Sequence, residues 1–536
     1  MSLNWEKNFD TATEAATPTE CRVLGELPAW LSVTLLRNGP GRYKFGVTEM
    51  RHWFDGMAFM QKYYFKNSKV YFSAKYLKSE TYNSNMAAQR IVVSQFGTRS
   101  FPDPCKNIFS RSFTHVFPEK EPMDNGVVNF IEYGDSVYAV TESPHMTKID
   151  QNTLDTICME DVSKYVSLHT SSAHHHMDNQ GNVFNFGMRF GKKTSIVFVK
   201  TDAPQANIPE DKTDVFGKST TILGTIPLAD NDPCYVHSFG MTENHLISFE
   251  SPLKMALWKI MLIRFNNKSG AETLDWKKTD KCSLVHIFNY KTGEAIPTVY
   301  KVEPFFTFHH ANAYEKDGLL FVDYCAYYNP DVGCLNLEEM RKNNFFPDGF
   351  ECYLKRVVIP IEIPKSAKSG EDLLKNKKGY HGQCKAILTV NKSKMLSVDL
   401  RSETLCTIPI EFPRYNYAWN AQEYKYMYGA MIFKSEEEPL AGLRTRNSSI
   451  AMDSTGTAQD ATIVDPTRSS AAHDTVEQVE DDNVSDIAFN ANHRASLIVK
   501  VDVENKSHAR TFEEVARCYI PQRVPFAFHG ITTSNK

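Results

Sequence analysis

The chain has 536 residues, a net charge of −4 and 42% hydrophobic residues, which is the composition of a soluble globular protein. The slight negative charge excludes the basic surface that nucleic-acid binding requires, and no run of 18 apolar residues predicts a transmembrane helix. The N-terminus shows neither an apolar signal core nor an Arg-rich presequence, and the 11 cysteines form no C-x-x-C pair, so we expect a cytoplasmic protein with free thiols.

Short strand candidates recur along the chain, separated by turn sequences. Each is rich in the β-branched and aromatic residues that favour strands: Lys69–Leu77, Thr194–Lys200, Ser283–Tyr290, Leu319–Tyr328 and Ser496–Val503. Helix candidates are few and short, namely Leu337–Asn344 and Ser369–Asn376. A long chain with this many short strands predicts an all-β barrel, sandwich or propeller.

One stretch departs from the strand pattern. Residues 434–494 are polar and small, with acidic runs at Glu436–Glu438 and Glu480–Asp482 and almost no aromatic side chains. Such a composition buries too little apolar surface to offset the entropy of ordering the chain. We therefore expect 434–494 to be a disordered loop within a single domain that spans residues 1–536.

Four histidines stand far apart in the sequence, and each lies in an apolar, strand-like setting. They are His174 within Ser171–His176, His237 within Cys234–Gly240, His309 within Phe305–Asn312 and His529 within Pro525–Gly530. Neutral imidazole is a good ligand for iron, zinc and copper. A single histidine of this kind is more often a buried residue with a hydrogen-bond partner. The shared setting of all four favours one metal site, because the ends of distant strands can meet on the axis of a closed fold.

Longer motifs surround these histidines along most of the chain. They are Leu35–Gly41, His52–Ala58, Phe96–Thr98, Pro102–Phe109, Thr141-Glu142, Ala173-His174, Val236–Glu243, Phe308–Asn312, Ile410–Pro413 and Phe528–Gly530. In these motifs the chain resembles the carotenoid cleavage oxygenase family, in particular its animal branch of β-carotene oxygenases, insect isomerooxygenases and the retinal-pigment-epithelium isomerohydrolase. The resemblance implies a seven-bladed β-propeller with a helical and loop cap over the metal-bearing face.

The resemblance also implies one Fe(II) per chain, bound by His174, His237, His309 and His529. In the family, three glutamates accept hydrogen bonds from the second nitrogens of three of these ligands, which fixes their tautomers. Glu142 and Glu411 match two of those positions, and we pair them with His237 and His309 respectively. The alternative is a pair of surface glutamates, but both lie in apolar sequence, where an unpaired carboxylate is costly.

The third glutamate is where the sequence departs from the family pattern. The family carries an apolar strand containing Glu-Pro between Tyr428-Gly429 and the final His-Gly, and nothing equivalent follows Val499–Asp502 here. Two alternatives stay open: the loop 434–494 replaces this strand, or a blade is incomplete and His529 lacks its carboxylate partner. Loss of such a partner typically weakens metal affinity or activity roughly 10–100-fold, which puts the activity of this chain in doubt.

The reaction implied by the resemblance is O2-dependent cleavage of a conjugated C=C bond in a carotenoid, with β-carotene 15,15′-cleavage to retinal as the leading hypothesis. By resemblance, Phe96 and Thr141 lie near the substrate. Three alternatives stay open: a retinoid isomerohydrolase that needs no O2, a catalytically impaired carotenoid-binding protein, and a zinc propeller hydrolase.

Carotenoids reside in membranes, so such an enzyme needs a docking surface. Pro102–Phe113 mixes aromatic, aliphatic and basic residues around Cys105. This segment fits an interfacial patch lipidated at Cys105 and, equally well, a buried loop with a free thiol. We expect peripheral membrane contact, whereas the oligomeric state, the bond cleaved and the preferred carotenoid do not follow from the sequence.

Overall fold

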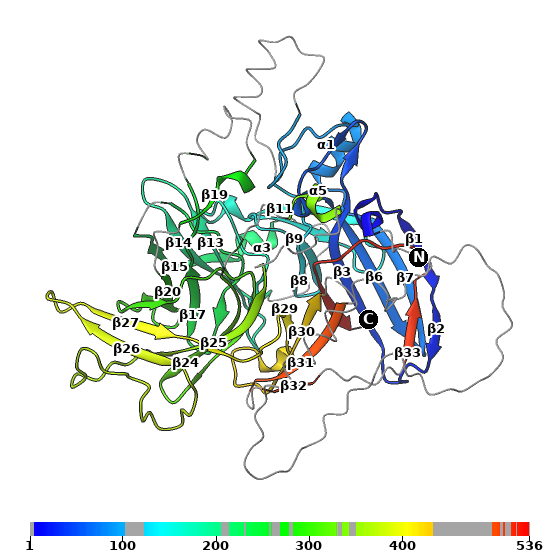
Figure 1. Cartoon of the computed structure of the whole chain (residues 1–536). Coiled ribbons are helices and arrows are strands. Elements are labelled where there is room, and N and C mark those ends of the chain that lie inside the picture. Colours follow the sequence, from blue (N-terminus) through cyan, green and yellow to red (C-terminus); the bar gives the residue numbers. More distant parts are fainter. Residues whose placement is uncertain are drawn as a thin grey trace, which may run out of the picture.

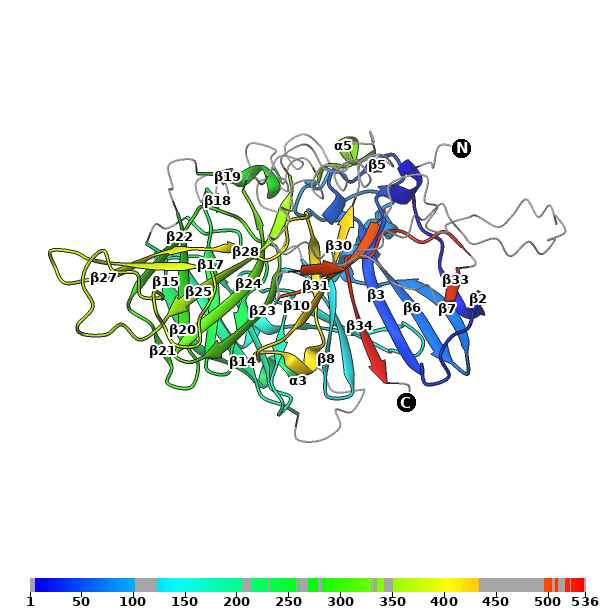
Figure 2. The same ribbon diagram turned by 60° about the horizontal axis from the view of Figure 1, so that its bottom comes forward.

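The computed structural model describes residues 5–101, 123–204, 214–229, 232–256, 259, 269–277, 282–328, 330, 335–341, 350–432, 496–503, 507–509, 516–520 and 522–534. Strand is far more common than helix among these residues, and their sheets are arranged like the blades of a propeller (Figure 1; Figure 2). The segment Pro102–Phe113 and the loop 434–494 lie outside the described residues, so both expectations stay predictions. None of the helices in the described ranges has the length and apolar character that crossing a membrane requires.

Six sheets of four or more strands are formed by the described residues. Four of them are antiparallel and four-stranded. The first two comprise β8 (Asn129–Tyr133), β9 (Ser136–Val140), β10 (His145–Ile149) and β11 (Thr156–Asp161), and then β12 (His176–Met177), β13 (Val183–Arg189), β14 (Ser195–Thr201) and β15 (Thr220–Pro227). The other two comprise β23 (His310–Lys316), β24 (Leu319–Tyr327), β25 (Cys352–Pro360) and β28 (Glu403–Thr404), and then β29 (Glu411–Arg414), β30 (Tyr426–Ile432), β31 (Ser496–Asp502) and β32 (Ser507–Ala509).

A fifth sheet is wider, because a hairpin from later in the chain adds to it. Its order is β16 (Gly240–Met241), β17 (His245–Glu250), β20 (Ser283–Asn289), β22 (Val299–Val302), β27 (Leu396–Arg401) and β26 (Lys385–Val390), with β21 (Glu294–Ala295) paired to β20. The β22–β27 pairing is parallel, and all the other pairings in this sheet are antiparallel.

The sixth sheet joins the two ends of the chain. Its order is β1 (Ala15–Glu20), β7 (Lys69–Tyr76), β6 (Met57–Lys66), β3 (Val33–Arg42) and β34 (His529–Ser534). The antiparallel β3–β34 register runs from Val33 opposite Ser534 to Asn38 opposite His529. The sheet is therefore completed only when the last strand pairs with one of the first. Farther out, β2 (Arg22–Gly25) pairs with β33 (Ala516–Tyr519).

The five strand candidates are confirmed as β7, β14, β20, β24 and β31, with boundaries within one residue of those predicted. The helix expected at Ser369–Asn376 is wrong, because this segment forms consecutive turns. Gly370 and Asn376 adopt left-handed φ angles of 89° and 62°, which an α-helix cannot contain. The described part of the other helix candidate is α5 (Leu337–Arg341).

Two α-helices of the described residues were not predicted: the short α3 (Val215–Lys218) and the longer α1 (Glu80–Ala88). The N-cap of α1 is Ser79, whose hydroxyl accepts a hydrogen bond from the backbone N–H of Tyr82. The cap residue is visible in the sequence, but the helix has almost no amphipathic stripe, so its apolar pattern gives no signal.

Candidate metal centre

Four strands at sheet edges deliver the four histidines to one place. His174 lies two residues before β12, His237 three residues before β16, His309 immediately before β23, and His529 is the first residue of β34. Each of these strands is the terminal strand of its sheet, so its starting end faces the common centre. The ring nitrogens of the four residues lie within 4.8 Å of one another, forming a four-histidine group that could hold a metal ion.

All four imidazoles turn their Nε2 atoms toward the same point. The Nε2 atoms of His174 and His237 are 2.8 Å apart, those of His237 and His309 are 3.2 Å apart, and those of His309 and His529 are also 3.2 Å apart. The rings of His237, His309 and His529 are buried. Burial lowers the pKa values of His174, His309 and His529 below the ordinary 6.5, because a charged ring loses its hydration. These imidazoles are therefore neutral at physiological pH, as metal ligation requires.

Glu142 orients the ring of His237. The Nδ1–H of His237 donates to Glu142 Oε1 at 2.7 Å, and the Tyr235 hydroxyl donates to the other carboxylate oxygen at 2.8 Å. Both oxygens are thus engaged, one by the histidine and one by the phenol. This arrangement fixes the proton of His237 on Nδ1 and leaves a lone pair on Nε2.

Glu411 performs the same task for His309. The Nδ1–H of His309 donates to Glu411 Oε2 at 2.7 Å, and the Tyr327 hydroxyl donates to Oε1 at 3.0 Å. The next residue, Phe412, has a left-handed φ of 53° and packs against the rings of His309 and His529 at 5.5 and 5.6 Å. A non-glycine residue in this region is strained, and such strain often marks functional sites.

The tautomers set by the two glutamates provide a test of whether a cation fits. Both His237 and His309 carry their proton on Nδ1, so their Nε2 lone pairs face each other at 3.2 Å with no hydrogen between them. Two opposed lone pairs repel, and a cation bound between them would turn that repulsion into two attractive contacts. The donor set of this structure therefore fits a metal ion that accepts neutral nitrogen ligands.

His529 differs from these two ligands in what contacts its outer nitrogen. Its Nδ1 lies 3.3 Å from Nη2 of Arg414, which also donates to the Gly530 carbonyl oxygen at 3.4 Å. No carboxylate of the described residues lies within ion-pair distance of His529 or His174. Among the described residues, the side chain that contacts this nitrogen is therefore an arginine.

The neighbouring histidines do not join the cluster. His175 Nε2 accepts a hydrogen bond from the amide of Asn185 at 2.8 Å, and His176 contacts the Phe239 carbonyl oxygen at 3.0 Å. His310 Nδ1 contacts the Ser238 hydroxyl at 2.8 Å. In each adjacent pair or triplet of histidines, the residue matched to the family motif is therefore the one that points to the centre.

An aromatic wall stands next to the histidine cluster. Phe308 packs edge-on against His237 at 5.2 Å, and Phe54 packs against Phe308 at 6.3 Å. Phe96 stacks on Tyr235 at 6.2 Å and packs against Phe54 at the same distance. The structure thus places Phe96 within an apolar surface that borders the site.

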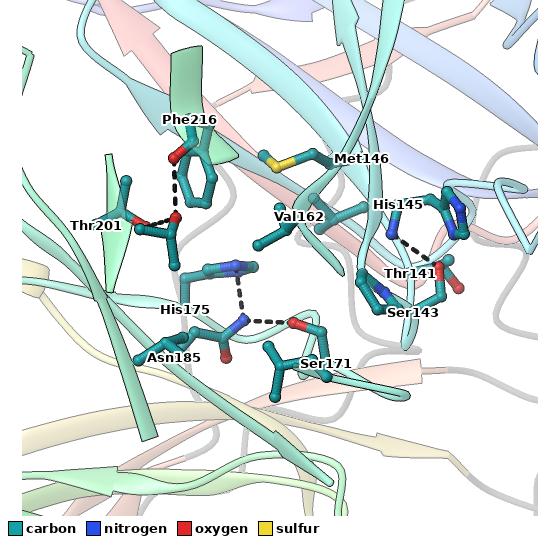
Figure 3. Close-up of a pocket in the computed structure, with 15 residues that line it drawn as sticks. Thr141, Ser143, His145, Met146, Val162, Ser171, His175, Asn185, Thr201 and Phe216 are labelled. Carbon is teal, nitrogen blue, oxygen red and sulfur yellow. Dashed lines mark hydrogen bonds between the residues drawn. The ribbon is translucent and has the colours of Figure 1, made fainter. Parts of the chain in front are cut away.

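Thr141, the residue before Glu142, lines a small cavity of about 20 Å³ (Figure 3). Ser171, His175 and Asn185 line the same cavity, and the Asn185 amide donates to both His175 Nε2 and the Ser171 hydroxyl. This volume holds about one water molecule and no polyene. Phe96 is not among the lining residues, so this cavity does not bring the two expected substrate residues together.

The family of the chain follows from comparison with known proteins. The family model described as retinal pigment epithelial membrane protein, RPE65, matches residues 8–532. The chain belongs to this family.

Curated relatives of the chain are similar over most of their length. The chain is 35% identical over 433 residues to "Beta,beta-carotene 15,15'-dioxygenase" of Rattus norvegicus, which covers 78% of this chain and 74% of the relative. It is 30% identical over 540 residues to "Carotenoid-cleaving dioxygenase, mitochondrial" of Homo sapiens, which covers 97% of this chain and 89% of the relative.

Solved structures share the overall fold of the chain. A variant of Synechocystis apocarotenoid oxygenase superposes with a TM-score of 0.67 at 15% identity, covering 99% of this chain and 98% of that chain. The cobalt-substituted form of the Synechocystis enzyme gives a TM-score of 0.65 at 16% identity, with the same coverage. At these identities the likeness concerns the fold alone.

Sequence reasoning missed three residues of the centre, namely Tyr235, Tyr327 and Arg414. Tyr235 stands two residues before His237 in the same motif, so its proximity to the site had a signal. The sequence contains no comparable signal for Arg414, whose contact with His529 crosses 115 residues.

Proposed function

We propose that this protein is an iron(II)-dependent dioxygenase that cleaves a conjugated C=C bond of a carotenoid. One observation carries the proposal: four imidazole Nε2 atoms converge at 2.8–3.2 Å spacing in a chain of the RPE65 family. The two curated relatives described above carry the names of carotenoid-cleaving dioxygenases. We place central 15,15′-cleavage of β-carotene first, since that relative has the higher identity of the two.

His174, His237, His309 and His529 would hold one Fe(II) per chain. Fe(II) supplies the ability to bind and activate O2, which no amino-acid side chain provides. Four neutral imidazoles leave the charge of the metal uncompensated, in contrast to the usual site of two histidines and one carboxylate. Glu142 and Glu411 keep two of the ligands in the binding tautomer, because their carboxylates hold the Nδ1 protons.

The remaining work of the protein is to position a long apolar substrate and exclude water. Phe54, Phe96, Tyr235 and Phe308 form a continuous aromatic surface beside the cluster. Aromatic faces bind a flat conjugated chain by dispersion and offer it no competing hydrogen bonds. We assign substrate contact to Phe96 on this basis, and to Thr141 on the family resemblance alone.

The finer architecture and location belong to the same proposal. We propose that the propeller has seven blades and a cap over the metal-bearing face. We also propose that the protein is cytoplasmic and contacts the membrane peripherally. A membrane-borne carotenoid would enter the protein at this contact. Family membership supports this architecture, and the low solubility of carotenoids supports the membrane contact.

A second candidate is a carotenoid-binding protein with impaired catalysis. The contact between Arg414 and His529 favours it, because one ligand lacks the carboxylate that would set its tautomer. A retinoid isomerohydrolase is a third candidate within the family, distinguished by turnover of a retinyl ester without O2.

The deciding experiment uses protein purified without oxygen and loaded with Fe(II). We expect aerobic incubation with β-carotene to yield retinal, identified by chromatography and mass spectrometry, and no product under nitrogen. Shifted carotenoid absorbance at one pigment per chain without aldehyde products would support the binding protein instead. Conversion of a retinyl ester under nitrogen would support the isomerohydrolase. The matched control is His237→Ala, which removes one proposed ligand.

A further inference from the structure

Two free thiols meet where segments from the two ends of the chain pair. Cys21 lies immediately before β2, and Cys518 lies in β33, where it stands opposite Val23. Side chains two residues apart on an extended chain share a face, so Cys21 and Cys518 are diagonal neighbours across this pairing. Their thiols are in hydrogen-bonding contact, although almost the whole sequence separates them.

The two thiols differ in exposure and in acidity. Cys21 is buried, with 4% of its surface exposed, whereas Cys518 is half-buried. The contact between them raises the pKa of Cys21 and lowers that of Cys518, because the Cys21 S–H can donate to a Cys518 thiolate. The thiolate is the form that reacts with peroxides, and access favours the more exposed sulfur. Cys518 is therefore the thiol that an oxidant reaches first, and Cys21 is in place to react next.

A covalent link at this point would join two strands that are held weakly. β2 and β33 form a separate sheet of two strands with four residue pairs. A sheet of this size is at best marginally stable by itself. After β33, the chain reaches β34 along hydrogen bonds that include Gln522 Nε2 to the Thr13 carbonyl oxygen at 2.7 Å and Gln61 Nε2 to the Pro525 carbonyl oxygen at 3.1 Å. A link between β2 and β33 would therefore fasten the segment that leads to His529.

We propose that Cys21 and Cys518 form a reversible disulfide when a hydroperoxide oxidises Cys518, and that this bond fastens the C-terminal segment to the N-terminal part of the chain. The Cys518 thiolate attacks the hydroxyl oxygen of the peroxide, so that an S–O bond forms, the O–O bond breaks and an alkoxide or hydroxide leaves. The sulfur of Cys21 then attacks the Cys518 sulfenic acid. An S–S bond forms, the S–O bond breaks, and the hydroxyl group leaves as water with the Cys21 proton. Two thiols are oxidised, one hydroperoxide is reduced, and a dithiol reductant reverses the change by exchange.

A second thiol pair among the described residues provides an internal control. Cys325 in β24 and Cys352 in β25 are also in hydrogen-bonding contact. Both are buried, with 0% and 5% of their surfaces exposed. The two pairs thus share the contact between thiols and differ in access. We expect Cys325 and Cys352 to stay reduced at a dose of peroxide that links Cys21 to Cys518.

The test uses the full-length chain, freed of reductant and treated with stoichiometric hydrogen peroxide. Remaining thiols are alkylated, and the digested protein is analysed by mass spectrometry without reduction. We expect a Cys21–Cys518 cross-linked peptide that dithiothreitol removes. In Cys21→Ser the Cys518 sulfenic acid should persist and react with a dimedone probe, whereas in Cys518→Ser the buried Cys21 should stay reduced. Cys158→Ser is the matched control, since it removes another partly exposed thiol and should leave the cross-link unchanged.

The fastening is measured separately from the chemistry. Peroxide should slow hydrogen exchange of the β33 amides and raise the thermal midpoint of the wild-type protein by about 5 °C, with neither effect in Cys21→Ser or Cys518→Ser. Absence of the Cys21–Cys518 peptide, or an equal yield of a Cys325–Cys352 peptide, would overturn the disulfide. Unchanged exchange in β33 of the cross-linked protein would overturn its fastening role. These measurements require no metal and no turnover, so their failure leaves the proposed function untouched.

Discussion

At the scale of single residues, two carboxylates do most to define the centre. Glu142 and Glu411 each bridge a histidine and a tyrosine, and the side chain of Glu411 is only 14% exposed. This pairing gives each ligand one orientation and one tautomer. The metal preference of the cluster therefore depends on residues that would not touch the metal.

Replacing Glu411 with alanine should weaken metal binding roughly 10–100-fold, because His309 would lose the acceptor for its Nδ1–H. Glu411→Gln keeps an acceptor oxygen and should lose less. The measurement is iron content and Co2+ affinity after identical loading. Glu315→Ala is the control. Glu315 Oε1 lies 2.9 Å from Nδ1 of His245, and neither residue belongs to the four-histidine cluster. A comparable loss in Glu315→Ala would show that the effect is general destabilisation.

Some of this site could be predicted from single residues and some could not. The convergence of four distant histidines and the pairing of two glutamates followed from motifs whose local sequence is distinctive. Tyr327 and Arg414 were not predictable, because their contacts with Glu411 and His529 cross 84 and 115 residues of chain. Such contacts depend on the angle between two sheets, which local sequence does not specify.

At the scale of elements, short segments between strands set the positions of the ligands. The segment before His174 runs across β13, where Ser172 N–H donates to the Phe186 carbonyl oxygen at 2.9 Å. Gly187 permits this crossing, because a Cβ there would lie 1.9 Å from the carbonyl oxygen of Thr170. The backbone of the ligand-bearing segment thus occupies the space that a side chain would need.

Gly187→Ala should therefore displace the segment that carries His174. We expect a loss of about 1–3 kcal/mol in the free energy of unfolding, together with weaker Co2+ binding. Chemical denaturation and metal titration measure the two effects. Gly191→Ala is the matched control, because a Cβ at Gly191 meets open space. Unchanged Co2+ affinity in a destabilised Gly187→Ala protein would show that His174 does not depend on this crossing.

The loop that carries Phe96 is anchored by a buried carboxyl group. Asp55 Oδ1 accepts from the Gly97 N–H at 2.9 Å, and Oδ2 bonds the Thr98 hydroxyl at 2.5 Å. Burial raises the pKa of Asp55 from 3.8 to about 7, despite these hydrogen bonds. The folded protein therefore favours the protonated carboxyl group more than the unfolded chain does.

The sign of the resulting pH dependence follows from this shift. Between pH 3.8 and about 7 the folded state binds the extra proton, so Asp55 contributes stability at low pH that is lost as the pH rises toward 7. The slope is up to about 1.4 kcal/mol per pH unit. Asp55→Asn removes this titration, so urea unfolding at pH 5 and pH 8 should show a smaller decrease in stability for the variant. An equal decrease in both proteins would contradict the raised pKa.

Element-scale prediction succeeded for the strands and for the described part of α5, but it was wrong for residues 369–376 and missed α1 and α3. The strands β7, β14, β20, β24 and β31 are dense in β-branched and aromatic residues, so their composition alone is sufficient. The turns at 369–376 and the helix α1 depend on backbone conformation and on a cap, and neither produces an apolar period.

At the scale of the whole molecule, one pairing joins the two ends of the chain. Strand β34 adds to β3 over six residue pairs and carries His529 at its first position. Deleting residues 529–536 should lower the thermal midpoint far more than His529→Ala does, because the deletion removes a strand while the substitution removes one ring. Circular dichroism on heating measures both. Equal midpoints would mean that β34 adds little to the stability of its sheet.

The β3–β34 pairing also means that the histidine cluster is completed late in synthesis. During synthesis His174, His237 and His309 leave the ribosome long before His529, and Arg414 precedes its partner by 115 residues. A nascent chain can therefore present three imidazoles to a metal ion before the fourth has been synthesised. If three imidazoles suffice to bind the ion, the metal can bind before strand β34 has formed. The pairing of β34 with β3 would then add His529 and enclose the metal.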